Sequence, residues 1–297
     1  MRVLLAGGSG FLGRALQSTL RAHGHSVAVL TRTPRPGATD QIAWKPDGTA
    51  GAWAQSLEGA DALVNLAGEG IADRRWSVAR KQALRSSRIL STRSLVAALR
   101  QVSRPPAVFT SGSAVGYYGP RGDELLTEAS PSGTDFLATL CVDWEREAEP
   151  AAALTRVAIV RSGLVLHPEG GALRSMLPPF RFGIGGRLGS GDQYMPWIHR
   201  ADWVALVEWI ITTDVAHGAF NGTAPPPVTN AEFSRALGRA LRRPAIFPVP
   251  GFALRAMVGE LADSLLTGQR AVPARAEALG FRFGFPSLDE ALRDLLN

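Results

Sequence analysis

The chain has 297 residues, of which 45% are hydrophobic and 20% are charged. This is a globular composition, and the chain is long enough to bury a large core in one domain or in two unequal ones. The single cysteine, Cys141, excludes an internal disulfide, a zinc ribbon and a Cys-x-x-Cys redox site. Glycines end the first apolar run early and no stretch approaches a bilayer-spanning length, so we expect a cytoplasmic protein without a secretory leader.

The net charge of +6 raises the question of a nucleic-acid partner. The basic residues are nearly all arginines and are scattered among acids; the densest basic segment, "RRWSVARKQALRSSRILSTR", spans residues 74 to 93. A solvated helix face accounts for this segment as well as a phosphate-binding stripe would. We therefore predict no nucleic-acid partner, and the alternative requires strongly salt-dependent binding.

Short apolar runs alternate with helical patterns in the first half of the chain. The predicted strands are Arg2–Ala6, Ser26–Thr31, Asp61–Leu66, Ala107–Thr110 and Leu154–Arg161. The predicted helices are Phe11–His23, Ser77–Gln101 and Asp135–Glu149. Continuous apolar strands that alternate with helices predict an α/β fold of the Rossmann type, a doubly wound parallel sheet covered by helices on both faces.

The alternation weakens after about residue 165. We predict a helix over Ala201–Thr213, a strand over Ala219–Gly222, and a helix that Thr229 caps together with Glu232. The last seventy or so residues are typical of helices separated by prolines. The predicted organisation is a dinucleotide-binding core at residues 1–165, which the strand near 218–222 rejoins, and a smaller, mostly helical C-terminal lobe on the substrate side at residues 166–297.

The stretch "LLAGGSGFLGRAL" places glycines between a strand and a helix. Gly8, Gly10 and Gly13 fit the spacing G-x-G-x-x-G, and Gly7, Gly10 and Gly13 fit the variant G-x-x-G-x-x-G. A pyrophosphate can sit at the helix N-terminus only if no side chain blocks its approach. A tight turn without a ligand is the alternative. The predicted cofactor contacts at this turn are Gly7, Ser9, Gly10, Phe11, Leu12 and Gly13.

The end of the second strand distinguishes NAD from NADP. NAD sites usually carry an Asp or Glu there, which holds the ribose 2′-hydroxyl. This chain has "VLTRTP" and no acid between Arg14 and Thr39. Arg32, flanked by Thr31 and Thr33, can meet a 2′-phosphate instead, and we therefore predict NADP(H) as the cofactor.

Several motifs together resemble the extended short-chain dehydrogenase/reductases. They are "AGGSGFLG", "DALVNLAG" at 61–68, "TSGSAVGYYG" at 110–119, residues 121–148, "RSGLVL" at 161–166 and "ALGFRF" at 278–283. The resemblance is to the atypical, epimerase-like branch that has a small C-terminal domain of uncharacterised role. It implies that Asn65, Leu66, Ala67 and Gly68 line the cofactor and that Ser113 bonds a substrate oxygen.

The chain departs from that family at its catalytic pair. Typical members carry a Tyr that transfers the proton accompanying hydride transfer, and a Lys four residues later that lowers the pKa of this Tyr. Here the tyrosines are Tyr117, Tyr118 and Tyr194, and none begins a Tyr-x-x-x-Lys motif. Alignment with the family places Leu137 and Cys141 in the two catalytic positions. We expect Cys141 to be a packed thiol rather than a nucleophile.

Three replacements for the missing pair remain open. Tyr117 or Tyr118 can supply the proton, His199 can act as acid or base, or the site can bind its cofactor without redox chemistry. Arg88, which stands where the family has an Asn, is a further predicted cofactor contact. His199 and Arg187 are the predicted substrate-binding residues. The five histidines are dispersed, so no metal site is predicted.

Two functions follow from these residues. The first is an NADP(H)-dependent oxidoreductase or epimerase-like enzyme that acts on a small polar carbonyl or hydroxyl substrate, with Ser113, Tyr117 and Tyr118 as catalytic residues. The second is a binding or regulatory protein that holds NADP(H) without turnover. The sequence reveals neither the substrate nor the oligomeric state.

Overall fold

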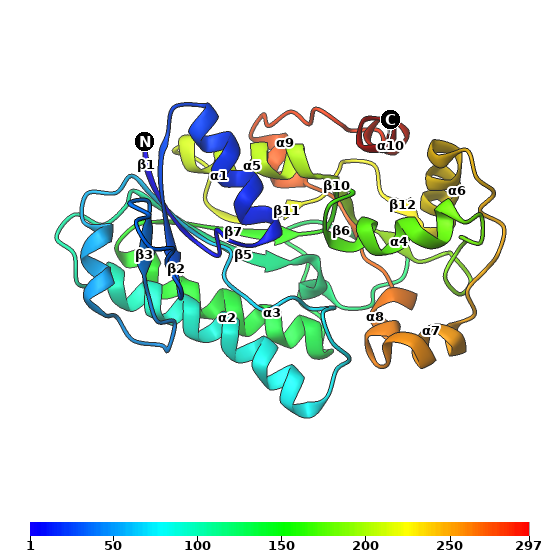
Figure 1. Ribbon diagram of the computed structural model, residues 1–297, viewed down its shortest axis with the longest axis horizontal. Helices are drawn as coiled ribbons and strands as arrows, with labels where there is room; N and C mark the ends of the chain where they lie inside the picture. Colours follow the sequence, from blue (N-terminus) through cyan, green and yellow to red (C-terminus); the bar gives the residue numbers. More distant parts are fainter. Residues whose placement is uncertain (297) are drawn as a thin grey trace.

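A seven-stranded parallel sheet forms the centre of the protein in a computed structural model that describes residues 1–296 (Figure 1). Asn297, the last residue of the predicted C-terminal lobe, lies outside the described residues. The strand order is β11-β7-β5-β4-β1-β2-β3, and every pair in this sheet is parallel. The strands are β1 (Arg2–Ala6), β2 (Ser26–Thr31), β3 (Gln41–Ala43), β4 (Ala62–Asn65), β5 (Val108–Ala114), β7 (Arg156–Ser162) and β11 (Gly218–Gly222).

Helices cover both faces of this sheet. α1 (Phe11–Ala22) and α5 (Arg200–Thr212) pack on one face, and α2 (Val78–Leu99) and α3 (Phe136–Ala148) pack on the other (Figure 1). The strand residues alternate between the two cores: Val3 of β1 joins the cluster that contains α1 and α5, whereas Leu4 joins the cluster that contains α2. The predicted doubly wound Rossmann-type fold is confirmed.

The C-terminal part adds helices and short strand pairs. The helices are α4 (Gly171–Arg181), α6 (Asn230–Leu241), α7 (Gly251–Val258), α8 (Leu261–Leu266), α9 (Ala274–Ala278) and α10 (Leu288–Leu296). The short pairs are β10 (Trp197–His199) with β8 (Leu164–Leu166), β12 (Val228–Thr229) with β9 (Tyr194–Met195), and β13 (Arg270–Ala271) with β6 (Leu125–Leu126). A separate core joins α4, α6 and α10. The predicted helical lobe is present, and the capping box of Thr229 and Glu232 begins α6.

The predicted strand Ala107–Thr110 is too short. β5 continues through "SGSA" to Ala114, because its polar residues are buried in the middle of the sheet, where pairing with β7 satisfies the backbone. Ser113 therefore lies inside a strand rather than in a loop beyond it. The two tyrosines after it form a short 3₁₀ turn, Val115–Tyr118.

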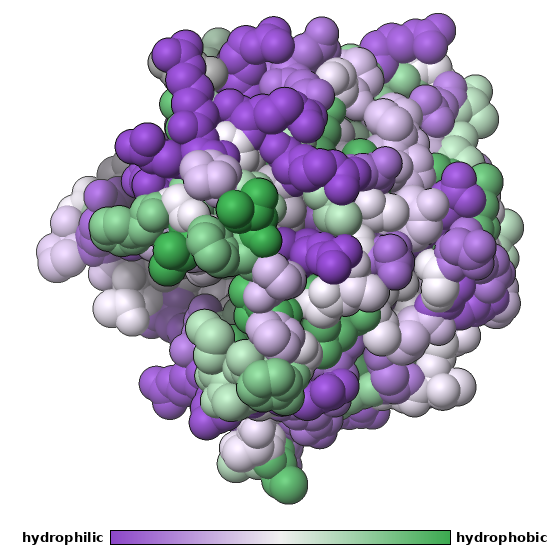
Figure 2. All heavy atoms as spheres, turned by 90° about the vertical axis from the view of Figure 1, so that its right-hand side faces the viewer, coloured by the Kyte–Doolittle hydropathy of each residue, from purple (hydrophilic) through white to green (hydrophobic). Residues whose placement is uncertain are grey.

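Hydrophobic side chains gather on the face that carries α4, α6 and α7 (Figure 2). Phe182, Ile246 and Phe252 are 82%, 72% and 76% exposed there. Residues 183–189 and 244–249 lie alongside each other through backbone hydrogen bonds such as that from the Phe247 N–H to the Gly185 carbonyl. Within residues 1–296 no helix combines the length and the hydrophobicity that a membrane crossing requires.

Candidate functional site

In the glycine turn between β1 and α1, backbone segments pass so close to one another that no side chain fits between them. Gly7 has φ +82°, and a Cβ there would lie 2.5 Å from the Leu66 carbonyl carbon. A Cβ at Gly13 would lie 2.3 Å from the Gly7 carbonyl oxygen. Gly10 is the N-cap of α1 without a side-chain cap, and a Cβ there would meet only the Gly7 oxygen, at 3.3 Å. The first turn of α1 therefore presents unpaired N–H groups without obstruction.

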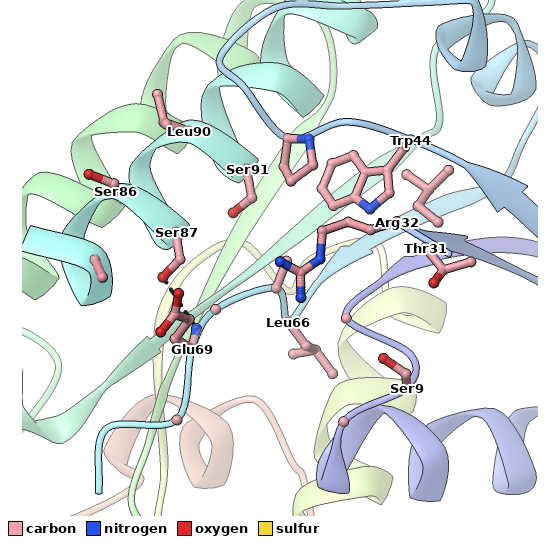
Figure 3. A pocket seen from close by; sticks show the side chains of 18 of the residues that line it. Ser9, Thr31, Arg32, Trp44, Leu66, Glu69, Ser86, Ser87, Leu90 and Ser91 are labelled. Carbon is pink, nitrogen blue, oxygen red and sulfur yellow. Dashed lines mark hydrogen bonds between the residues drawn. The ribbon is translucent and has the colours of Figure 1, made fainter. Parts of the chain in front are cut away.

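A pocket of about 820 Å³ opens beside this turn (Figure 3). It lies between the ends of β1, β2 and β4 and one face of α2. Arg32 points into it near the Trp44 indole and Leu66. The predicted residues that line it are Gly7, Ser9, Gly10, Thr31, Arg32, Thr33, Leu66, Ala67 and Gly68.

Part of the lining of this pocket was not identified from the sequence. It comprises Trp44, Pro46, Glu69, Ala83, Ser86, Ser87, Leu90 and Ser91, among others. Ser87 and Ser91 are four residues apart on α2, so they share one helix face, and this spacing was a usable signal. The Ser87 Oγ accepts the Glu69 N–H at 3.2 Å, and the Glu69 carboxylate pairs with Arg80.

Five predicted cofactor contacts are not among the lining residues: Phe11, Leu12, Gly13, Asn65 and Arg88. Two of them support the pocket from behind. The buried Asn65 donates to Thr92 Oγ1 at 2.9 Å and accepts from the Ala67 N–H at 3.1 Å, which fixes the loop after β4. Arg88 donates to the Glu69 carbonyl at 2.9 Å and lies over the Trp144 ring, and burial lowers its pKa.

Three others belong to α1 and its packing. Gly13 is buried beneath the Gly7 carbonyl, and Phe11 and Leu12 pack against the core cluster of α1 and α5. The Arg200 guanidinium lies 5.6 Å from the centre of the Phe11 ring. These side chains set how closely α1 approaches the sheet.

A second group of polar residues lies at the ends of β5 and β7. The Ser113 Oγ donates to Glu145 Oε1 at 2.6 Å. Arg161 holds both oxygens of this carboxylate, with Nε to Oε1 and Nη2 to Oε2 each at 2.9 Å. The side chains of Arg161 and Glu145 are only 6% and 12% exposed. Burial opposes the charge of Arg161, but its bonds to Glu145 outweigh burial and raise the pKa of Arg161.

The two predicted tyrosines differ in their surroundings. Tyr118 is fully buried; its hydroxyl donates to Asn221 Oδ1 at 2.7 Å and accepts from Arg161 Nη1 at 3.0 Å. Burial raises the pKa of Tyr118 to about 12, against the opposing effect of Arg161. Tyr117 is half-buried, its ring lies 3.5 Å below the Arg161 guanidinium, and its hydroxyl has no partner within residues 1–296.

This burial predicts a loss of stability at alkaline pH. Between pH 10 and pH 12 the unfolded chain releases the Tyr118 proton while the folded chain keeps it, so the free energy of unfolding falls by about 2–3 kcal/mol. Urea unfolding of the wild type and of Tyr118→Phe at several pH values measures this loss. The stability difference between the two proteins should shrink across this range; a constant difference would contradict the raised pKa.

Leu137 and Cys141 face the same region from α3. A Cβ at Gly116 would touch Leu137 at 3.2 Å, and the Cys141 thiol lies against Ser113 and Ala114. Burial, together with the charge of Glu145, raises the pKa of Cys141 to about 11, so the thiol is protonated at neutral pH. Neither residue can replace a Tyr/Lys pair. Glu145, one helical turn beyond Cys141, was not identified from the sequence.

His199 and Arg187 are not among the residues that line the pocket beside the glycine turn. His199 is the N-cap of α5: Nδ1 accepts from the Ala201 N–H at 3.0 Å, Nε2 lies 3.2 Å from Asp294, and the ring stacks on Phe285. It lines a different pocket, and burial lowers its pKa. Arg187 is exposed and packs against Gly191.

Asp202 lies in the first turn of α5. Its carboxylate accepts the N–H groups of Gly284 and Phe285 at 2.7 and 2.9 Å, because the C-terminal segment returns across the start of the helix.

Much of the basic segment 74–93 is paired with acids, for example Arg93 with Glu147. Among the described residues no group of three or more His, Cys, Asp or Glu side chains is arranged to hold a metal ion.

The fold and the glycine turn define a Rossmann-type α/β protein with a pocket at the carboxyl ends of its strands. The chain belongs to the NAD dependent epimerase/dehydratase family, which matches residues 3–221. Residues 249–295 match a second family, described as a Domain of unknown function (DUF1731). The resemblance inferred from the motifs is confirmed.

The chain is similar to several proteins over its whole length. It is 46% identical to the epimerase family protein Mb2239 of Mycobacterium bovis, over 98% of this chain and 96% of that protein. It is 43% identical to the epimerase family protein SDR39U1 of Bos taurus, over all of both chains. The crystal structure of the human epimerase family protein SDR39U1 with NADPH has a TM-score of 0.93 at 39% identity, over 100% of this chain and 99% of that one.

Proposed function

We propose that the chain binds NADP(H) in the pocket beside the glycine turn. The observation that carries the proposal is that Arg32 points into the same pocket that the bare turn opens. The open space around Gly10 suits a pyrophosphate at the N-terminus of α1, and a guanidinium suits a 2′-phosphate. The human relative crystallised with NADPH supports the same cofactor.

We infer further that the protein is an oxidoreductase or epimerase-like enzyme for a small polar carbonyl or hydroxyl substrate. The bound cofactor would supply or accept hydride. Ser113 would hold the substrate oxygen, and Tyr117, with its free hydroxyl, suits the proton transfer better than Tyr118, whose hydroxyl is fully bonded. The loop after β4 lines the cofactor pocket, and β5, which carries Ser113, is the next strand of the sheet. This neighbourhood supports a substrate site at Ser113.

One observation favours the alternative of an NADP(H)-binding protein without turnover. The family's Tyr and Lys positions are occupied by an apolar side chain and a protonated, fully buried thiol, Leu137 and Cys141. The two functions are distinguished by following NADPH oxidation in the presence of a panel of aldehydes, ketones and nucleotide sugars. NADPH binding without oxidation of NADPH by any of them would favour the binding protein.

Substitution of Arg32 tests the cofactor assignment. Arg32→Ala should weaken NADPH binding about 10- to 100-fold, because one or two charge-assisted hydrogen bonds to the 2′-phosphate are lost. Binding of NADH, which lacks this phosphate, should be unchanged. Isothermal titration with both cofactors measures the two affinities.

Arg35→Ala is the matched control, because Arg35 is an exposed arginine of the same loop that is not among the lining residues. It should leave both affinities unchanged. Equal weakening of NADPH and NADH binding by Arg32→Ala, or tighter binding of NADH by the wild type, would contradict the assignment.

A further inference from the structure

The C-terminal segment 268–275 crosses to the tyrosine turn of the core. β13 of this segment pairs with β6, and the Val272 N–H donates to the Leu126 carbonyl at 2.9 Å. Gln269 Nε2 donates to the carbonyl of Gly119, the residue that follows Tyr118, at 3.2 Å. The segment lies within the region of unknown function, 249–295, and so connects that region to the predicted substrate site.

Glu128, on the loop after β6, joins three parts of the chain. Its Oε1 accepts the N–H of Asn221, in β11, at 2.9 Å. Its Oε2 accepts the N–H of Arg275, at the end of the C-terminal segment, at 3.1 Å. Its backbone carbonyl accepts Arg161 Nη1 at 3.2 Å. Loss of this one carboxylate would leave buried donors unpaired on both the sheet and the C-terminal segment.

Asn221 completes the connection to Tyr118. Its Nδ2 donates to the Val272 carbonyl at 2.9 Å, while its Oδ1 accepts the Tyr118 hydroxyl at 2.7 Å. Tyr118 in turn bonds Arg161, which holds Glu145 and, through it, Ser113. A continuous series of hydrogen bonds therefore runs from the C-terminal segment to Ser113.

The tyrosines need such support because of where the chain carries them. Tyr117 and Tyr118 lie on a single 3₁₀ turn of four residues, which cannot hold its own geometry. Outside contacts must fix it to the tolerance that catalysis requires.

We propose that the segment 268–275 is the positioning element of this site: acting through Glu128 and Asn221, it fixes the 3₁₀ turn and the Arg161 side chain that stacks on Tyr117. This assigns a role to the region of unknown function and makes Glu128 and Asn221 positioning residues. The proposal deepens the proposed function and rests on it for the meaning of the site.

The test uses Glu128→Gln in the full-length protein, because glutamine keeps one acceptor and turns an amide N–H₂ toward a backbone N–H. Hydrogen exchange in residues 115–118 should become about 10- to 100-fold faster, as expected for loss of one hydrogen bond to a charged group. Burial raises the pKa of Tyr118 to about 12, and in the variant this pKa should move back toward the ordinary value of a tyrosine, as followed by the phenolate absorbance. The NADPH affinity should stay within about two-fold of the wild type, because Glu128 is not among the residues that line that pocket.

Glu124→Gln is the matched control, because this exposed glutamate lies just before β6 and its carboxylate pairs, among the described residues, only with Arg121. It should change neither readout. Gln269→Ala is a milder second variant for the case that Glu128→Gln does not fold, and it should speed exchange at the same turn. Exchange that rises only within 268–275, while 115–118 stay protected, would overturn the proposal. A wild type that does not bind NADPH would instead refute the proposed function and leave this test of the turn intact.

Discussion

Glu145→Gln is expected to destabilise the folded protein by about 3–5 kcal/mol. The substitution leaves the Arg161 guanidinium buried at 6% exposure without its carboxylate, and an uncompensated buried charge is among the costliest defects in a protein interior. The glutamine oxygen can still accept from Ser113, but the amide N–H₂ that replaces the second carboxylate oxygen cannot accept from Arg161. Urea unfolding at neutral pH, followed by circular dichroism, measures the change in free energy.

Glu147→Gln provides the control on the same helix. Glu147 forms a similarly short pair with Arg93, at 2.6 Å, but Arg93 is 52% exposed, so this pair should contribute no more than about 1 kcal/mol. The double variant Glu145→Leu/Arg161→Met removes both buried charges and should recover much of the loss. A cost of Glu145→Gln no larger than that of Glu147→Gln would show that Arg161 finds other partners.

The parts of the site that sequence patterns predicted are those set by local geometry. A strand followed by closely spaced glycines and a helix needs bare backbone at the turn, and the structure has it at Gly7 and Gly13. Arg32 follows β2 directly, so its position at the carboxyl end of that strand was also predictable from the sequence. Ser113 was identified through the family resemblance, although its strand was drawn too short because "TSGSA" is polar.

The buried polar network was not predictable in the same way. Glu145 comes from α3, Arg161 from β7 and Asn221 from β11, and the Tyr118–Asn221 hydrogen bond spans 103 residues of sequence. Each of these residues looks like an ordinary surface charge or amide in its own segment. Only the parallel packing of β5, β7 and β11 brings their carboxyl ends together, so the network is a property of the sheet order and not of any local pattern.

Two substitutions in the glycine turn should separate an effect on stability from an effect on cofactor binding. Gly13→Ala should destabilise the protein by about 3 kcal/mol or more, because its Cβ would meet the Gly7 carbonyl oxygen at 2.3 Å and the Gly8 Cα at 2.6 Å, and backbone atoms cannot rotate away. Gly10→Ala should cost no more than about 1 kcal/mol, because Gly10 has φ −73° and the nearest atom lies at 3.3 Å.

Gly10→Ala, which should cost little stability, should weaken cofactor binding strongly. The Cβ of Gly10→Ala would occupy the approach to the α1 N-terminus, so NADPH affinity should fall about 100-fold or more in a protein that still unfolds cooperatively. Thermal unfolding with and without NADPH measures both effects, since a bound cofactor raises the melting temperature. If Gly10→Ala keeps the full NADPH-dependent rise, the phosphates do not lie at this turn, and the pocket must hold a different ligand or hold NADPH in another orientation.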